Sequence, residues 1–148
     1  MNNSHDISVL NGLIETTLDS VKGYSDAAED STGTYTPFFR EMATERSAVA
    51  TRLQSLVAGL GGDPEQHSSM GAAAHRGFMN LKEALMGTND RAVIEEVERG
   101  EDYLKTKYET ALADTDLSAE TRQAIEQAFQ SVRKGHDRAS ALKHSIVA

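Results

Sequence analysis

The sequence contains no cysteine and no tryptophan, and only two of its 148 residues are proline. Without cysteine there is no disulfide framework and no thiolate metal site, a composition compatible with a reducing cytoplasm. Aromatic residues make up 5% of the chain, so the core must be built mainly from Leu, Ile, Val, Met and Ala. Scarce proline, together with frequent Ala, Glu, Gln, Lys and Arg, favours helix throughout.

Long apolar runs are also missing. No stretch approaches the ~18 apolar residues that a membrane-spanning helix needs, and the first residues, MNNSHD, show no basic region followed by an apolar one, which predicts no signal peptide. The formal net charge is −8, a sign that repels nucleic-acid phosphates and anionic lipid surfaces. These features predict an acidic, cytoplasmic protein with neither nucleic acid nor membrane as its partner.

What is present is the pattern of a helical protein. The length of 148 residues, with 39% hydrophobic and 26% charged residues, suits a single domain, 1–148, with one core. Apolar residues recur at steps of three and four, the helical period, which predicts long helices over residues 7–30, from Pro37 to Leu60, over 90–113, and from Ser118 through Leu142. Ser4 or Asp6 can cap the first helix, and no strand pattern is visible.

A shorter helix is predicted around residues 69–86, between the second and third long helices. At about 1.5 Å per residue it spans roughly 27 Å, close to the length of a bundle. A connection that traverses the bundle lets the second and third long helices run parallel, which is the one-crossover topology of ferritin-like bundles. The fold class expected is therefore all-α, a ferritin-like four-helix bundle with an additional crossover helix, and the alternative is an up-down array of five helices.

Five segments resemble those of a known family. They are residues 13–24 (LIETTLDSVKGY), 61–64 (GGDP), 75–82 (HRGFMNLK), 98–102 (ERGED) and 136–138 (HDR). In order and spacing they are similar to a bacterial family of small ferritin-like four-helix-bundle proteins whose domain carries only an unknown-function label. The resemblance covers nearly the whole chain. It implies a ferritin-like bundle and implies no known activity.

Three ionisable residues, Arg46, Glu101 and His136, fall on helical stripes that should otherwise be apolar. A buried polar group must be paired or it costs stability. We therefore expect a core polar network in which Arg46 pairs with Glu101 or with a shared partner such as His136. Two interpretations stay open at this point: a core ion pair that fixes helix register, or a reduced, repurposed metal pocket.

A complete di-metal centre is not expected. Ferritin-like di-metal proteins supply a Glu from each of two helices and a Glu-x-x-His from each of the other two. In this sequence Ala48 follows Glu45 by three residues and Arg133 precedes His136 by three, so neither pair is complete. The remaining candidate ligands for a single ion are Glu45, Glu101 and His136. An inward Arg46 opposes even that ion, because a guanidinium is permanently charged and cannot ligate a cation.

The sequence shows no Gly-rich phosphate loop, no nucleophile elbow and no Ser-His-Asp signature. The leading hypothesis is a non-enzymatic binding or assembly module that holds no cofactor. The alternative is a metal-binding ferritin-like protein that uses a reduced carboxylate and histidine site for storage or redox chemistry. A homo-oligomer with a structural role is a third hypothesis.

Overall fold

In the computed structural model, residues 3–30, 35–67 and 90–147 are described. They form four helices, α1 (Ser4–Asp30), α2 (Thr36–Gly59), α4 (Asp90–Leu112) and α5 (Ala119–Val147). Within those ranges there is no strand, and none of the helices is long and apolar enough to cross a membrane. The predicted all-helical class and the four long helices are confirmed.

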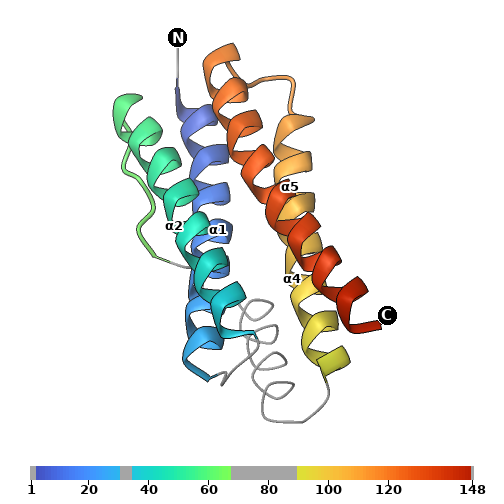
Figure 1. The fold of residues 1–148 in the computed structure, drawn as a ribbon. Coiled ribbons are helices and arrows are strands. Elements are labelled where there is room, and N and C mark those ends of the chain that lie inside the picture. Colours follow the sequence, from blue (N-terminus) through green and yellow to red (C-terminus); the bar gives the residue numbers. More distant parts are fainter. Residues whose placement is uncertain (1–2, 31–34, 68–89, 148) are drawn as a thin grey trace.

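The helices pack as a bundle in which helices that contact each other run antiparallel (Figure 1). α1 packs against α2 and α4, and α5 packs against α4 and α2. The chain descends through α1, rises through α2, rises again through α4 and descends through α5 (Figure 1). α2 and α4 therefore run in the same direction. The crossover helix predicted around residues 69–86 lies outside the described residues.

The helix ends follow local sequence signals. Pro37 stands in the first turn of α2, where its missing N–H costs no hydrogen bond. Gly61, just past the end of α2, has φ +87°, the left-handed conformation that glycine adopts without a Cβ penalty. Asp6 does not cap α1 as proposed, because α1 already begins at Ser4 and the Asp6 carboxylate instead accepts hydrogen bonds from Ser118 and Thr121.

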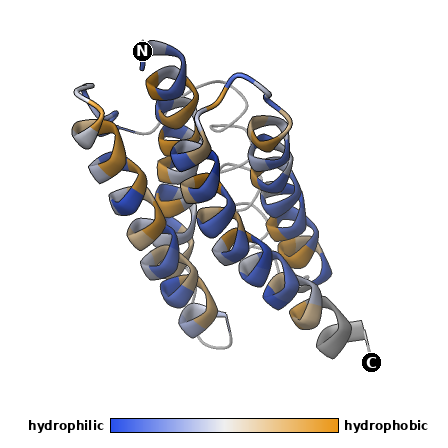
Figure 2. Ribbon diagram, turned by 90° about the horizontal axis from the view of Figure 1, so that it is seen from above, coloured by the Kyte–Doolittle hydropathy of each residue, from blue (hydrophilic) through white to orange (hydrophobic). Residues whose placement is uncertain are grey.

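Two hydrophobic clusters fill the bundle. One cluster lies at the end of the bundle formed by the first half of α1 and the second half of α2. It includes Leu10, Ile14, Leu53, Tyr108 and Ile125. The other lies toward the opposite end, and includes Tyr24, Phe39, Met42, Val97 and Ala139. Hydrophobic residues recur between hydrophilic ones along each helix (Figure 2), as an amphipathic helix with one buried face requires.

Buried polar residues lie where these two clusters meet. Arg46 follows Met42 and precedes Val49 on α2, and Glu101 occupies the corresponding step between Val97 and Leu104 on α4. The side chains of Arg46 and Glu101 are 0% and 2% exposed. The core is therefore polar at this level, between two clusters that are mainly apolar.

Candidate functional site

The buried polar group at mid-bundle is a two-point ion pair between α2 and α4. Arg46 Nη2 lies 2.5 Å from Glu101 Oε1 and Arg46 Nη1 lies 2.9 Å from Glu101 Oε2. This fork-to-fork geometry is the strongest form of a charge-assisted hydrogen bond and also fixes the relative orientation of the two groups. Because the two charges cancel, the core carries no net charge at this level.

Two side chains of α1 complete the hydrogen bonding. The Tyr24 hydroxyl donates to Glu101 Oε2 at 2.6 Å, and Arg46 Nη1 donates to Ser20 Oγ at 2.9 Å. Burial raises the pKa of Tyr24 well above its ordinary value, and the neighbouring Glu101 charge raises it further, so the hydroxyl keeps its proton. Burial alone lowers the pKa of Arg46, but the hydrogen bonds and charge of Glu101 outweigh it and the pKa lies above its ordinary value.

One donor of this network has no acceptor. Arg46 Nε is buried and is the one buried side-chain nitrogen or oxygen without a hydrogen-bond partner in the described part of the chain. The guanidinium also stands over the Tyr24 ring, with Cζ 5.9 Å from the ring centroid, a cation–π contact that offsets part of the missing bond.

α5 contributes a glycine to the same level of the bundle. A Cβ placed on Gly135 would collide with Arg46 Nη2, lie 2.8 Å from Met42 Cε and 3.3 Å from Glu101 Oε1. The absence of a side chain at Gly135 therefore makes room for the ion pair. The sequence interpretation missed this residue, although a glycine on the buried stripe of a helix, with Val132 before it and Ala139 after it, was the available signal.

A second buried pair lies one turn away along α1. Thr17 Oγ1 is 2.8 Å from the Tyr108 hydroxyl and also donates to the Leu13 carbonyl at 2.6 Å. Burial raises the pKa of Tyr108 to about 12. Every oxygen of this pair has a partner, so it joins α1 to α4 without leaving an open ligand position.

His136 does not lie at the centre with Arg46 and Glu101. Its side chain is 26% exposed, and its Nε2 lies 2.7 Å from Oδ1 of the exposed Asp102. The physical reason is helical phase: Gly135 faces the core, and the next residue turns by about 100° toward the rim between α5 and α4. The expectation that His136 shares the Arg46–Glu101 network is therefore corrected.

Glu45 lies on the seam between α2 and α5, away from Glu101. Its Oε1 accepts a hydrogen bond from Arg138 Nη1 at 2.9 Å, and the other arm of Arg138 pairs with Glu41. Because Glu45 and Arg46 are adjacent on α2, they point to different faces of the helix, and only Arg46 faces the core. The three candidate metal ligands, Glu45, Glu101 and His136, therefore lie at three separate places in the bundle.

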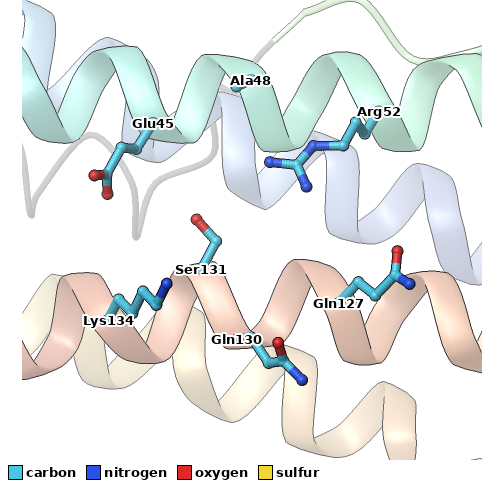
Figure 3. Close-up of a pocket in the computed structure, with 7 residues that line it drawn as sticks. All are labelled: Glu45, Ala48, Arg52, Gln127, Gln130, Ser131 and Lys134. Atoms are coloured by element: carbon cyan, nitrogen blue, oxygen red, sulfur yellow. The ribbon is translucent and has the colours of Figure 1, made fainter.

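The same seam opens into a groove of about 540 Å³ a turn further along. The residues that line it come from α2 and α5, and six of the seven are polar or charged: Glu45, Ala48, Arg52, Gln127, Gln130, Ser131 and Lys134. In Figure 3 the guanidinium of Arg52 and the carboxylate of Glu45 extend from α2 into the gap between the two helices. Ser131 points into the gap from α5, and the side chain of Lys134 lies along α5. Sequence reasoning did not identify this groove, because it exists only where two helices pack.

A third polar cluster ties the start of α1 to the turn between α4 and α5. His5 Nε2 lies 2.7 Å from Asp114 Oδ2, and Asp116 also offers a carboxylate oxygen within 4.8 Å of these atoms. The Asp114 carboxylate already accepts the Asp116 N–H, which together with His5 lowers the pKa of Asp114. His5 and Asp116 are exposed, and this cluster is an ordinary surface arrangement of an acidic protein.

The core donor set does not fit a metal ion. Both oxygens of Glu101 are bound by Arg46, one of them also by Tyr24, and a cation near Glu101 would face the fixed charge of the guanidinium. The arrangement is suited to joining three helices, and it holds no obvious reactive group.

Bundle and core together define a class: an all-helical four-helix bundle with a buried ion pair at its centre. The chain belongs to the family described as a domain of unknown function (DUF2383), whose model matches residues 5–114. The fold is similar to the crystal structure of a conserved hypothetical protein, Rv2844, from Mycobacterium tuberculosis, with a TM-score of 0.71 and 10% identity over 96% of this chain and 99% of that one. No curated protein matches the sequence.

Proposed function

We propose that this protein is a non-enzymatic binding or assembly module, in which a ferritin-like bundle is closed at its centre by an ion pair. The observation that carries the proposal is the bidentate contact between Arg46 and Glu101, both fully buried. In a di-metal bundle the corresponding space holds ions between carboxylates and histidines of facing helices. Here a guanidinium supplies the positive charge instead. The bundle then serves as a rigid scaffold whose outer faces are available for binding.

The ferritin-like part of this proposal is supported by helix direction. α1 and α4 run antiparallel, and α2 and α4 run in the same direction (Figure 1), the relation expected of a bundle with one long crossover. The crossover helix itself, around residues 69–86, stays a prediction. Circular dichroism of a peptide would not test it; backbone NMR shifts of the whole chain would.

The alternative of a single metal ion has no supporting geometry. Glu101 is bound by Arg46 and Tyr24, Glu45 by Arg138 and His136 by Asp102. Bringing the three candidate ligands together would require breaking a buried ion pair and two surface ones. We therefore retain the non-enzymatic scaffold as the proposed function.

Elemental analysis tests this proposal. Protein purified without a His-tag from cells supplied with iron and manganese should hold well under one iron per chain, and Glu101→Ala should leave the metal content unchanged. Glu109→Ala, which removes an exposed carboxylate of the same helix, is the matched control. Stoichiometric iron or manganese that is lost in Glu101→Ala and kept in Glu109→Ala would overturn the proposal and restore the metal-binding alternative.

A further inference from the structure

The seam between α2 and α5 has two sections of opposite character. In one, Arg138 of α5 is matched by two carboxylates of α2, Glu41 and Glu45, so the charges across the seam are paired. In the other, Arg52 of α2 and Lys134 of α5 line the groove, and neither forms an ion pair or a side-chain hydrogen bond within residues 3–30, 35–67 and 90–147. The groove therefore presents two unpaired cations on a protein of net charge −8. Its one carboxylate, Glu45, stands where the two sections meet and is already bound by Arg138.

The other residues that line the groove indicate which kind of anion it can bind. Ser131, Gln127 and Gln130 supply a hydroxyl and two amides, which both donate and accept hydrogen bonds, and none of them has a side-chain partner in the described part of the chain. Ala48 is the one apolar residue of the lining, and no aromatic ring is among these residues. Such a surface offers no stacking platform for a nucleobase and no apolar floor for an acyl chain.

We propose that the groove between α2 and α5 binds a small hydroxylated phosphate monoester, such as a sugar phosphate. Arg52 and Lys134 hold the phosphate from opposite sides of the seam, the guanidinium by its fork and the ammonium as a point charge. Ser131 and Gln127, whose side chains point toward α2 in Figure 3, bind the hydroxyls of the organic body. A volume of about 540 Å³ lies within the usual range of small-molecule sites. This inference rests on the proposed role of the bundle as a binding module.

NMR titration of ¹⁵N-labelled full-length protein tests the inference, with glucose 6-phosphate, inorganic phosphate and glucose as separate probes. We expect shift changes at residues 48, 52, 127, 130, 131 and 134 with glucose 6-phosphate, weaker changes at the same residues with inorganic phosphate, and none with glucose. Arg52→Gln and Lys134→Gln should each weaken glucose 6-phosphate binding by about tenfold or more, the scale of a lost charge-assisted hydrogen bond. Added salt should weaken it as well.

Arg40→Gln on α2 and Lys105→Gln on α4 are the matched controls, because each removes one positive charge from outside the groove. Binding that falls equally in the controls and in the groove variants would overturn the proposal, as would the absence of groove shifts at ~10 mM glucose 6-phosphate, a concentration that detects even millimolar affinity. Equal affinity for inorganic phosphate and glucose 6-phosphate would overturn the part that assigns hydroxyl contacts to Ser131 and Gln127. The metal analysis above is independent of every one of these outcomes.

Discussion

At the scale of single residues, the most consequential contact is the Arg46–Glu101 pair. Removing two charges from water costs several kcal/mol for each, and their attraction repays this only when the remaining hydrogen bonds are also made. Here Tyr24 and Ser20 make them, while Arg46 Nε stays without an acceptor. The pair therefore stabilises the fold little more than a pair of apolar residues in the same place would. Removing one member, however, leaves the other as an unpaired buried charge, which is strongly destabilising.

A double-mutant cycle should show this asymmetry. Arg46→Met and Glu101→Leu should each lower the free energy of unfolding by about 3–5 kcal/mol, whereas the double variant should recover much of that loss. Urea denaturation of the four proteins measures it. Single variants that unfold at the same urea concentration as the parent protein would contradict the buried pair.

Gly135 should resist substitution for a related reason. Alanine in a helix usually adds up to about 1 kcal/mol of stability over glycine, but a Cβ at Gly135 meets Arg46 Nη2 and Met42 Cε. Because the guanidinium is held by Glu101 and cannot swing away, Gly135→Ala should lower the free energy of unfolding by about 1–3 kcal/mol. Thermal or urea unfolding provides the measurement.

Gly100→Ala supplies the control, since a Cβ at Gly100 meets nothing within 4 Å and the same helix propensity applies. It should raise stability by up to about 1 kcal/mol. If Gly135→Ala stabilised the protein as much as Gly100→Ala does, the close approach of Arg46 to α5 would be refuted.

At the scale of whole elements, the first turn of α1 holds the start of α5. Ser118 caps α5, its Oγ accepting the Thr121 N–H at 3.3 Å, and its hydroxyl donates to Asp6 Oδ2 at 2.7 Å. Thr121 Oγ1 also donates to Asp6. The carboxylate thus lies at the positive end of the α5 dipole, and it joins two helices that are more than 100 residues apart in sequence.

This contact predicts a pH dependence. Burial raises the pKa of Asp6, but the hydrogen bonds from Ser118 and Thr121 and the nearby His5 charge lower it, and the net pKa lies below its ordinary value of 3.8. The ionised form is therefore favoured by folding, so the stabilisation is present above the ordinary pKa and is lost as pH falls through the lowered one. Asp6→Asn should reduce the loss of stability on acidification from about pH 5 to about pH 2.

Urea unfolding at a series of pH values measures this effect. Glu126→Gln is the comparison, because Glu126 is an exposed carboxylate past the first turn of α5 and its replacement should leave the acid-dependent loss of stability nearly unchanged. An Asp6→Asn protein whose acid sensitivity matched that of the parent would show that Asp6 is not stabilised by its contacts with α5.

At the scale of the whole molecule, the two hydrophobic clusters belong to one cooperative unit. Each of the four helices contributes residues to both clusters, and the Arg46–Glu101 and Thr17–Tyr108 pairs tie α4 to α2 and α1 where the clusters meet. If one cluster opened alone, a helix would have to break or a buried charge would have to lose its partner. The folded bundle should therefore open as a unit.

Native-state hydrogen exchange tests this cooperativity. Amides beside Leu53 in one cluster and beside Met42 in the other should exchange with similar free energies, both close to that of global unfolding. Exchange that is faster by several kcal/mol around one of the two residues would instead indicate two separately unfolding halves.

Much of this molecule follows from local pattern alone. The spacing of apolar residues placed the four long helices, and Pro37, Gly61 and Ser118 marked helix ends that the structure confirms, because caps and breakers act over a few residues. The same periodicity set Arg46 and Glu101 on inward stripes, and both are buried. It also misplaced His136, since a residue at the edge of a stripe can face the core or the rim depending on how the neighbouring helix packs.

The remaining features depend on contacts between segments distant in sequence, which periodicity does not encode. The pairing of Arg46 with Glu101 was expected from the sequence and is confirmed. Why Gly135 carries no side chain and why Asp6 serves α5 instead of α1 are decided by how the four helices are packed together. The groove that contains Arg52 and Lys134 has the same origin, because its two walls are α2 and α5. The sequence by itself determined a helical bundle whose inner charges had to pair, because an unpaired buried charge is too costly. Only the tertiary structure decided that His136 lies outside that pair and that two other cations, on the outer seam, have no such partner, because both depend on how neighbouring helices pack.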